Sequence, residues 1–213
     1  MGSAPVASNT NFPAPLAVVG FLAAWGGFLF VGGLALIFWF ARKPKFARIA
    51  LSTIAVGAVI YLALLLGFSA GSRETDLARG QEKYFCEIDC HLAYSVADAR
   101  LKPDGNYLVT LRTRFDETTT SPRRPQDATL TPSPREARLV DSAGHEYAPV
   151  SAGGTPLVTP LKPRDSYTTQ LEFNLPKAAI GLRLLLKTAP QWPDYVVIGD
   201  ENSWLHKKTY FVL

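Results

Sequence analysis

Two long runs without a charged residue constrain this chain more than any other feature. The first covers residues 16–41 and the second covers residues 49–70. Each run exceeds the roughly 20 apolar residues that an α-helix needs to cross a hydrocarbon layer about 30 Å thick. The sequence therefore predicts a hairpin of two transmembrane helices over 16–70 and excludes a wholly soluble protein. The part after residue 70 is long enough for one compact domain.

Charge is distributed in a way that predicts the orientation of this hairpin. Every Asp and Glu lies beyond residue 72, whereas four of the 22 Lys and Arg residues lie in the loop 42–48 between the two runs, namely Arg42, Lys43, Lys45 and Arg48. Short basic loops remain on the cytoplasmic side of a membrane. We therefore expect the loop inside and both termini, with the tail 1–15 and the large C-terminal part, outside.

The charge balance also excludes some functions. Outside the loop, 18 basic residues balance 18 acidic ones, so the C-terminal part is neutral and offers little attraction to a phosphate backbone. We do not expect nucleic-acid binding. Neither apolar run contains an ionisable residue, which transport and proton relay usually require, so a pump or a channel is not expected either.

Small residues follow one another at four-residue spacing in the first run. Gly20 pairs with Ala24, and Ala23 pairs with Gly27. Such spacing lets a neighbouring helix approach closely. Two interpretations are open: these residues pack the two helices of the hairpin on each other, or they form a docking face for another membrane subunit.

The hydropathy pattern changes to a period of two after a short polar stalk at 71–82. Residues 84–96 and 107–115 alternate between apolar and polar, with strong turn chemistry at 102–106, and further short strands are expected at 138–141, 146–150, 167–175, 182–186 and 209–213. Residues 116–135 are rich in proline and predict a long loop. The sequence therefore predicts an all-β antiparallel sandwich over 83–213.

The stretches 139–147 (LVDSAGHEY) and 161–176 (LKPRDSYTTQLEFNLP) resemble the immunoglobulin-like domains of unknown function found on the outer face of many bacterial membranes. This resemblance covers about residues 83–213. It implies an immunoglobulin-like sandwich and a bacterial inner membrane, with the domain and both termini in the periplasm. It implies little about activity, because such sandwiches support many unrelated functions.

The segment Cys86-Glu-Ile-Asp-Cys90-His91 contains the only two cysteines and is the one cluster of candidate metal ligands. A disulfide between Cys86 and Cys90 would suit the oxidising exterior. Four residues of regular strand span about 13 Å, whereas bridged cysteines have Cα atoms within about 6.8 Å of each other, so a disulfide would require a turn or a bulge here.

Two other interpretations of this segment are open. Cys86, Cys90 and His91 resemble a c-type haem attachment motif with one extra residue between the cysteines. The layout of two membrane helices before a β domain also resembles cytochrome oxidase subunit II, where Cys86 and Cys90 would match the copper-bridging thiolates and Tyr94 stands in place of a histidine. His145 or His206 could complete such a site from another strand. Alternatively, the cysteines are reduced and only pack.

The sequence contains no phosphate-binding glycine loop and no His-x-x-x-His pair, so an enzyme is not expected. We expect a non-enzymatic, membrane-anchored binding or scaffold module without a cofactor, acting as an accessory subunit of a larger inner-membrane complex. Its expected partners are the lipid bilayer and other membrane-protein subunits, contacted through exposed strand edges and the loop 116–135. The alternative is an electron-transfer subunit with haem c or copper at Cys86, Cys90 and His91.

Overall fold

The computed structural model describes residues 7–10, 14–86, 90–120, 125, 127–189 and 192–213. The chain divides into two compact units. The helical unit consists of Thr10–Ser72 together with Trp192–Lys207, and the β unit contains the other described residues.

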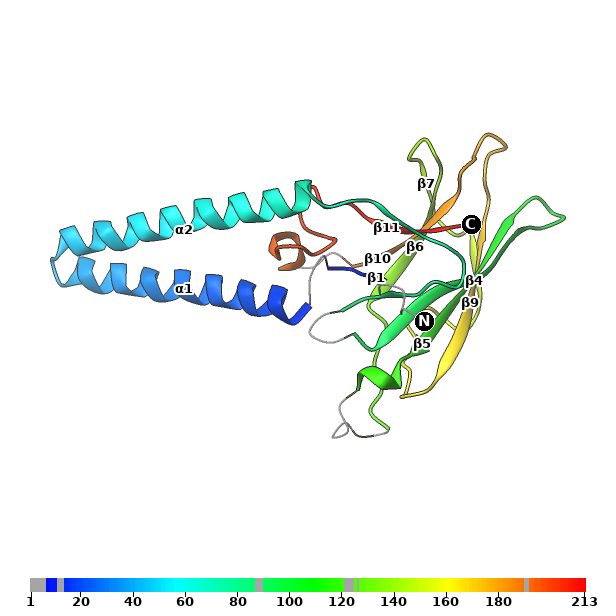
Figure 1. Ribbon diagram of the computed structural model, residues 1–213, viewed down its shortest axis with the longest axis horizontal. Coiled ribbons are helices and arrows are strands. Elements are labelled where there is room, and N and C mark those ends of the chain that lie inside the picture. Colours follow the sequence, from blue (N-terminus) through cyan, green and yellow to red (C-terminus); the bar gives the residue numbers. More distant parts are fainter. Residues whose placement is uncertain (1–6, 11–13, 87–89, 121–124, 126, 190–191) are drawn as a thin grey trace, which may run out of the picture. The chain divides into compact units, whose positions relative to one another are not determined.

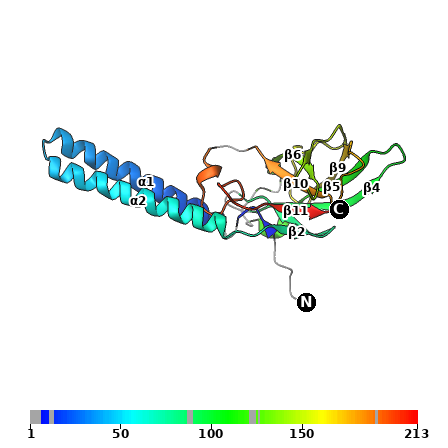
Figure 2. The same ribbon diagram turned by 90° about the horizontal axis from the view of Figure 1, so that it is seen from above.

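Two helices of 27 residues each make up most of the helical unit: α1 (Ala14–Phe40) and α2 (Pro44–Ala70). They lie side by side in Figure 1 and again in the perpendicular view of Figure 2. Arg42, in the turn between them, has a positive φ of 55°, and Pro44 occupies the first turn of α2, where its missing N–H costs nothing. Each helix is about 40 Å long at 1.5 Å per residue, which exceeds the thickness of a hydrocarbon core.

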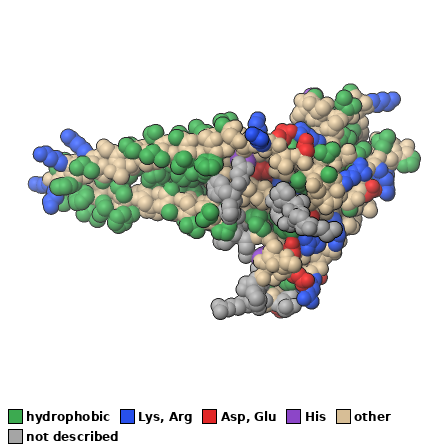
Figure 3. All heavy atoms as spheres, viewed as in Figure 1, with side chains coloured by type: hydrophobic (Ala, Val, Ile, Leu, Met, Phe, Trp, Pro, Cys, Tyr) green, Lys and Arg blue, Asp and Glu red, His purple; other side chains and the backbone are tan. Residues whose placement is uncertain are grey.

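The two helices bury only a narrow stripe between them. Ala35 in α1 and Ala47 and Leu65 in α2 are buried, and a Cβ on Gly57 would lie 3.0 Å from the ring of Phe28. The other faces are apolar and exposed, with Leu29 at 75% exposure, and Figure 3 shows hydrophobic side chains along both helices. The prediction of two long apolar helices is confirmed, and both are long and apolar enough to cross a membrane.

In the described part of the chain the β unit contains two sheets. The first has the order β1-β3-β4-β5-β9-β8 and the second has the order β2-β11-β10-β6-β7. The strands of the first sheet are β1 (Ala7–Ser8), β3 (Lys83–Tyr84), β4 (Leu92–Leu101), β5 (Tyr107–Phe115), β9 (Ser166–Phe173) and β8 (Ser151–Gly154). Those of the second are β2 (Thr75–Leu77), β11 (Thr209–Val212), β10 (Arg183–Thr188), β6 (Pro134–Val140) and β7 (Glu146–Tyr147).

The predicted hairpin of β4 and β5 is confirmed. These strands pair antiparallel from Leu92 with Phe115 to Leu101 with Tyr107, and a bulge interrupts the register between Val96 and Asp98. The turn at 102–106 closes through a 2.8 Å hydrogen bond from the Lys102 N–H to the Asn106 carbonyl oxygen. Gly105 takes a φ of 87°, which a residue with a side chain rarely adopts.

Two pairings depart from the predicted antiparallel arrangement. β1 pairs with β3 in parallel, and β2 pairs with β11 in parallel. The segment predicted as a stalk, 71–82, therefore contains a sheet strand. Alternation in a sequence indicates that a strand exists but does not indicate its partner, so neither pairing could be predicted.

Large side chains from both sheets fill the space between them. Tyr94, Val96, Val109, Leu111, Phe115 and Phe173 come from the first sheet, and Leu139, Leu184 and Phe211 come from the second. All nine are almost completely buried. This core gives the β unit the two-layer packing expected of a sandwich.

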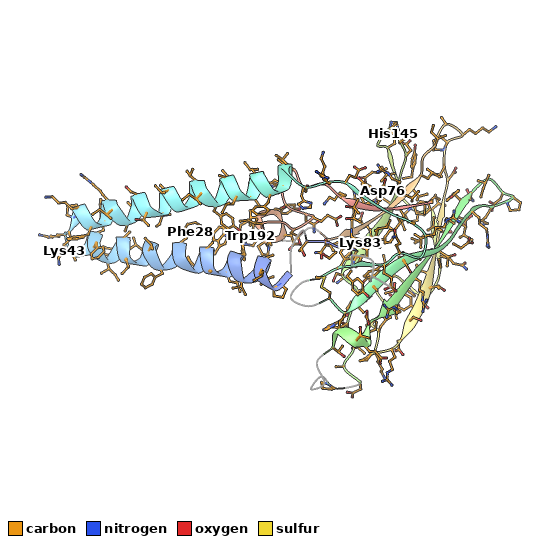
Figure 4. All side chains as sticks on the ribbon, in the orientation of Figure 1. Phe28, Lys43, Asp76, Lys83, His145 and Trp192 are labelled. Carbon is orange, nitrogen blue, oxygen red and sulfur yellow. A yellow bond between two sulfur atoms is a disulfide. The ribbon has the colours of Figure 1, made fainter. Side chains whose placement is uncertain are left out.

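A buried lysine links the two sheets. Lys83 in β3 is fully buried, and its Nζ lies 4.5 Å from the centroid of the Phe85 ring (Figure 4). The same ammonium donates a 3.5 Å hydrogen bond to the carbonyl oxygen of Thr209 in β11. An ammonium group is costly to bury without such partners, so these contacts hold β3 of one sheet against β11 of the other.

Candidate functional site

The two cysteines form a disulfide. Cys86 follows β3 and Cys90 precedes β4, and their Cα atoms are 4.4 Å apart. The single long strand predicted over 84–96 is thus two strands with the bridge between them, which removes the conflict between strand spacing and disulfide geometry. Residues 87–89 of the motif lie outside the described residues. The disulfide interpretation is confirmed.

This disulfide and its surroundings do not fit haem or copper. Sulfur atoms bonded to each other can neither form thioethers with a porphyrin nor act as thiolate ligands. His91 stacks on Phe115 with ring centroids 5.8 Å apart, and its Nδ1 lies 2.7 Å from Thr119 Oγ1. Among the described residues no group of three or more His, Cys, Asp and Glu side chains could hold a metal ion.

The other two histidines lie in separate places. His145 is in the turn between β6 and β7, with its Nδ1 3.0 Å from Asp141 Oδ2 (Figure 4). His206 belongs to the helical unit, where its Nδ1 donates a 2.6 Å hydrogen bond to the Lys207 carbonyl oxygen.

An ion-pair network lies next to the disulfide. Arg114 in β5 donates two parallel hydrogen bonds to Glu82, of 2.9 Å from Nε and 2.8 Å from Nη2. Tyr84 donates a 2.6 Å hydrogen bond from its hydroxyl to Asp116 Oδ2. The Asp116 N–H donates a 2.7 Å hydrogen bond to the carbonyl oxygen of His91. The network thus fastens the end of β5 to the chain on both sides of the disulfide.

The pKa values in this network are shifted by the partners within it. Burial raises the pKa of Asp116, but hydrogen bonds from Tyr84, Thr118 and Arg114 outweigh burial and lower it to about 2. The hydrogen bond from Arg114 also lowers the pKa of Glu82. Burial and the contact with Asp116 raise the pKa of the Tyr84 hydroxyl. Each shift favours the protonation state that the network already uses, as in a structural cluster.

A residue outside the expected site completes these contacts. Asn9 follows β1, and its side chain exchanges hydrogen bonds with the backbone of Cys86, accepting one of 2.7 Å at Oδ1 and donating one of 3.3 Å from Nδ2. The N-terminal residues were predicted only as a tail. No local pattern distinguishes Asn9 from other polar residues, so the sequence carried no signal for this contact.

The small residues of α1 lie mostly away from α2. Gly20, Ala23 and Gly27 are exposed, and a Cβ on either glycine would meet nothing within 4 Å. Ala24 is half-buried. The four basic residues lie in or next to the turn between the two helices, where Figure 4 labels Lys43. Three of the four small residues therefore form an open face rather than the contact between the helices.

The helical unit also contains a segment that the sequence predicts as part of the sandwich. Residues Trp192–Lys207 pack on the helices through contacts at several levels. The rings of Trp192 and Trp25 meet edge to face with centroids 5.5 Å apart, and the hydroxyl of Tyr61 donates a 2.6 Å hydrogen bond to the Val196 carbonyl oxygen. We call residues 192–207 the aromatic segment.

Further contacts fasten this segment near the end of α2. The hydroxyls of Ser69 and Ser203 lie 3.1 Å apart, and the Lys207 N–H donates a 2.8 Å hydrogen bond to Ser72 Oγ. The aromatic segment was missed because it is short and carries three carboxylates. Its sequence WPDYVVIG, which clusters aromatic and β-branched residues after a proline, was the one available signal.

No family model matches the sequence, and no curated protein matches it. The structure is similar to the crystal structure of MPT63, a secreted protein from Mycobacterium tuberculosis, with a TM-score of 0.43 and 10% sequence identity over 68% of this chain and 100% of that chain. The fold therefore defines the class on its own: a β-sandwich protein with an N-terminal pair of helices able to span a membrane.

Proposed function

We propose that the protein is a non-enzymatic module anchored in a bacterial inner membrane, with its sandwich in the periplasm, where it acts as an accessory subunit of a larger membrane complex. The observation that carries this proposal is the helical hairpin, whose apolar surface is exposed and whose four basic residues surround one turn. Apolar area of this size is not left in water, and the basic turn favours the cytoplasmic side.

The chemistry of the β unit supports a binding role. A disulfide suits the periplasm, where such bonds persist. The titratable groups next to it bond to one another, which fixes their charges rather than leaving one group ready for proton transfer.

Two surfaces are available for a partner. The open face of α1, formed by Gly20, Ala23 and Gly27, permits the close approach of another transmembrane helix. In the β unit, β8 is an edge strand whose four residues are all exposed, and an exposed edge can accept a strand from another chain.

Thiol labelling tests the orientation. The native cysteines are bonded, so a cysteine introduced at Leu101 in the sandwich or at Ala41 in the turn provides a single reactive thiol. With a membrane-impermeant reagent on spheroplasts, Leu101→Cys should be labelled at once and Ala41→Cys only after permeabilisation. The reverse pattern would place the sandwich in the cytoplasm and overturn the proposal.

Native gels in mild detergent test the accessory role. We expect the wild type to migrate in a complex larger than its own 23.2 kDa, and Gly27→Leu to release it by blocking close helix approach. Gly26→Leu is the matched control, because Gly26 is equally open but about 100° further around the helix. Wild-type protein that runs alone under all mild conditions would contradict the accessory role.

A further inference from the structure

The aromatic segment reaches far along the helices. Tyr61, which donates to the Val196 carbonyl oxygen, is followed by nine residues of α2, the last of which is Ala70, or about 13 Å of helix axis at 1.5 Å per residue. On α1, Trp25 meets Trp192 eleven residues after Ala14, about 16 Å from that end of the helix. The segment therefore contacts both helices well away from their ends, in the half of the hairpin that is opposite the basic turn.

The positions of the basic residues indicate how deep these contacts lie in a membrane. Arg48 is the last charged residue before the apolar part of α2, so the hydrocarbon region begins near Ile49. About 20 residues cross it, which places its outer boundary near Ser69, where Ser203 docks. By this scale Tyr61 and the turn at Val196 lie about 12 Å inside the hydrocarbon boundary.

We propose that the aromatic segment is re-entrant: it enters the outer half of the bilayer between the helices, with Trp192 and Tyr195 against lipid acyl chains and Trp204 and Leu205 at the headgroup boundary. Trp192 is 63% exposed, Trp204 51% and Leu205 68%, which is unusual for large apolar side chains in water. Tryptophan and tyrosine favour the membrane interface because their rings are apolar and carry one polar group.

Non-helical backbone inside a membrane needs hydrogen-bond partners, and several backbone groups of the turn at 193–197 have them. The short helix η2 (Asp194–Val196) closes through hydrogen bonds from Val196 to Pro193 and from Val197 to Asp194. The Tyr61 hydroxyl satisfies the Val196 carbonyl oxygen. Asp194, the carboxylate in this turn, is half-buried and has interactions within the protein. Irregular backbone is tolerated at membrane depth where the protein supplies its hydrogen-bond partners, as these contacts do for part of the turn.

The occupant of the exposed aromatic surface is lipid, because that surface continues the lipid-facing surface of the helices. Trp25 and Phe28 in α1 also pack edge to face, so the ring of Trp192 extends a row of aromatic side chains that begins within the helix. No boundary of charged side chains separates the two surfaces in the described part of α1.

Quenching by brominated lipids tests the proposal on the full chain in phosphatidylcholine vesicles. A variant that retains only Trp192 (Trp25→Phe, Trp39→Phe, Trp204→Phe) should have a blue-shifted emission and lose intensity when the bromine is on the acyl chain. A variant that retains only Trp204 should be quenched more strongly by a shallow bromine than by a deep one. Emission from Trp192 that no bromolipid quenches would overturn the proposal.

Two controls separate this inference from the proposed function on which it rests. Phe30→Trp in the tryptophan-free chain reports the middle of α1, and Leu101→Trp reports the sandwich. If Phe30→Trp is not quenched, the membrane anchor itself is wrong. If it is quenched and Trp192 behaves like Leu101→Trp, only the re-entrant segment is wrong.

Thiol labelling provides a second measurement that keeps every native tryptophan. Tyr195→Cys should react many-fold more slowly than Leu101→Cys with an impermeant maleimide in vesicles, and detergent should not be needed for Leu101→Cys. Equal labelling rates in vesicles would contradict the re-entrant position.

Discussion

The hydroxyl of Tyr61 donates a 2.6 Å hydrogen bond to the backbone carbonyl oxygen of Val196 and so connects the middle of α2 to a turn 135 residues further along the chain. Tyr61→Phe removes only this donor. Because loss of a partner for a buried polar group costs about 1–3 kcal/mol, we expect the aromatic segment to open more often. Hydrogen exchange of residues 192–207 should accelerate about tenfold or more, since 1.4 kcal/mol corresponds to a factor of ten.

Tyr195→Phe is the control for this prediction, because it removes a hydroxyl from an exposed ring of the same segment. It should leave exchange unchanged. Identical exchange in wild type and Tyr61→Phe would show that the hydrogen bond does not hold the segment.

Removal of the disulfide should destabilise the β unit. It should not abolish a redox activity, as the electron-transfer alternative would require. Cys86 and Cys90 are four residues apart and close a small loop, for which chain entropy predicts about 2 kcal/mol of stabilisation. Denaturant unfolding of the Cys86→Ser, Cys90→Ser double variant should show this loss. The purified wild type should have the intact mass of the oxidised chain; a Soret band or stoichiometric copper would instead restore the electron-transfer alternative.

Asp116 should make the β unit sensitive to acid. Its pKa is about 2 in the folded protein against an ordinary 3.8, so its stabilising effect is complete above pH 4 and disappears as the pH falls from about 4 to 2. A shift of this size corresponds to about 2 kcal/mol. The thermal midpoint should fall over this range in the wild type and fall less in Asp116→Asn.

Glu136→Gln is the matched control, because Glu136 pairs with Arg138 at a solvent-exposed position. This variant should keep the wild-type dependence on pH. If Asp116→Asn also kept it, the network around Arg114 would not account for acid sensitivity.

Gly154 at the end of β8 should not tolerate a side chain. Its φ is 71°, and an added Cβ would lie 2.9 Å from the carbonyl oxygen of Thr168. Left-handed backbone costs a non-glycine residue about 1–2 kcal/mol, so Gly154→Ala should lower the free energy of unfolding by at least that amount. Gly153→Ala, whose Cβ would make only ordinary contacts with Gln170, should have little effect. Equal unfolding midpoints for both variants would contradict this account.

The features that could be predicted from the sequence are those that neighbouring residues determine. Uncharged runs gave both helices, and alternation with turn residues such as Gly105 gave the hairpin of β4 and β5. Local strand geometry also showed that a bridge between Cys86 and Cys90 needed a turn. In each case the residues responsible lie close to one another in the sequence.

Contacts between distant segments could not be predicted in this way. The parallel pairing of β2 with β11 and the contact of Asn9 with Cys86 join residues whose own sequences are ordinary. The aromatic segment carries Asp194, Asp200 and Glu201, so a hydropathy pattern assigned it to the outer domain. Its place is determined by single partners on the helices, such as Trp25 and Tyr61.

The position of the aromatic segment in the chain has a consequence for biosynthesis. α1 and α2 leave the ribosome long before residues 192–207, so for most of translation the Tyr61 hydroxyl has no Val196 carbonyl to bond. β2 likewise has no pairing partner until the end of translation, because β11 lies at Thr209–Val212. The nascent hairpin must therefore persist in an incomplete form, and a chain interrupted before Trp192 would lack pieces of both units at once.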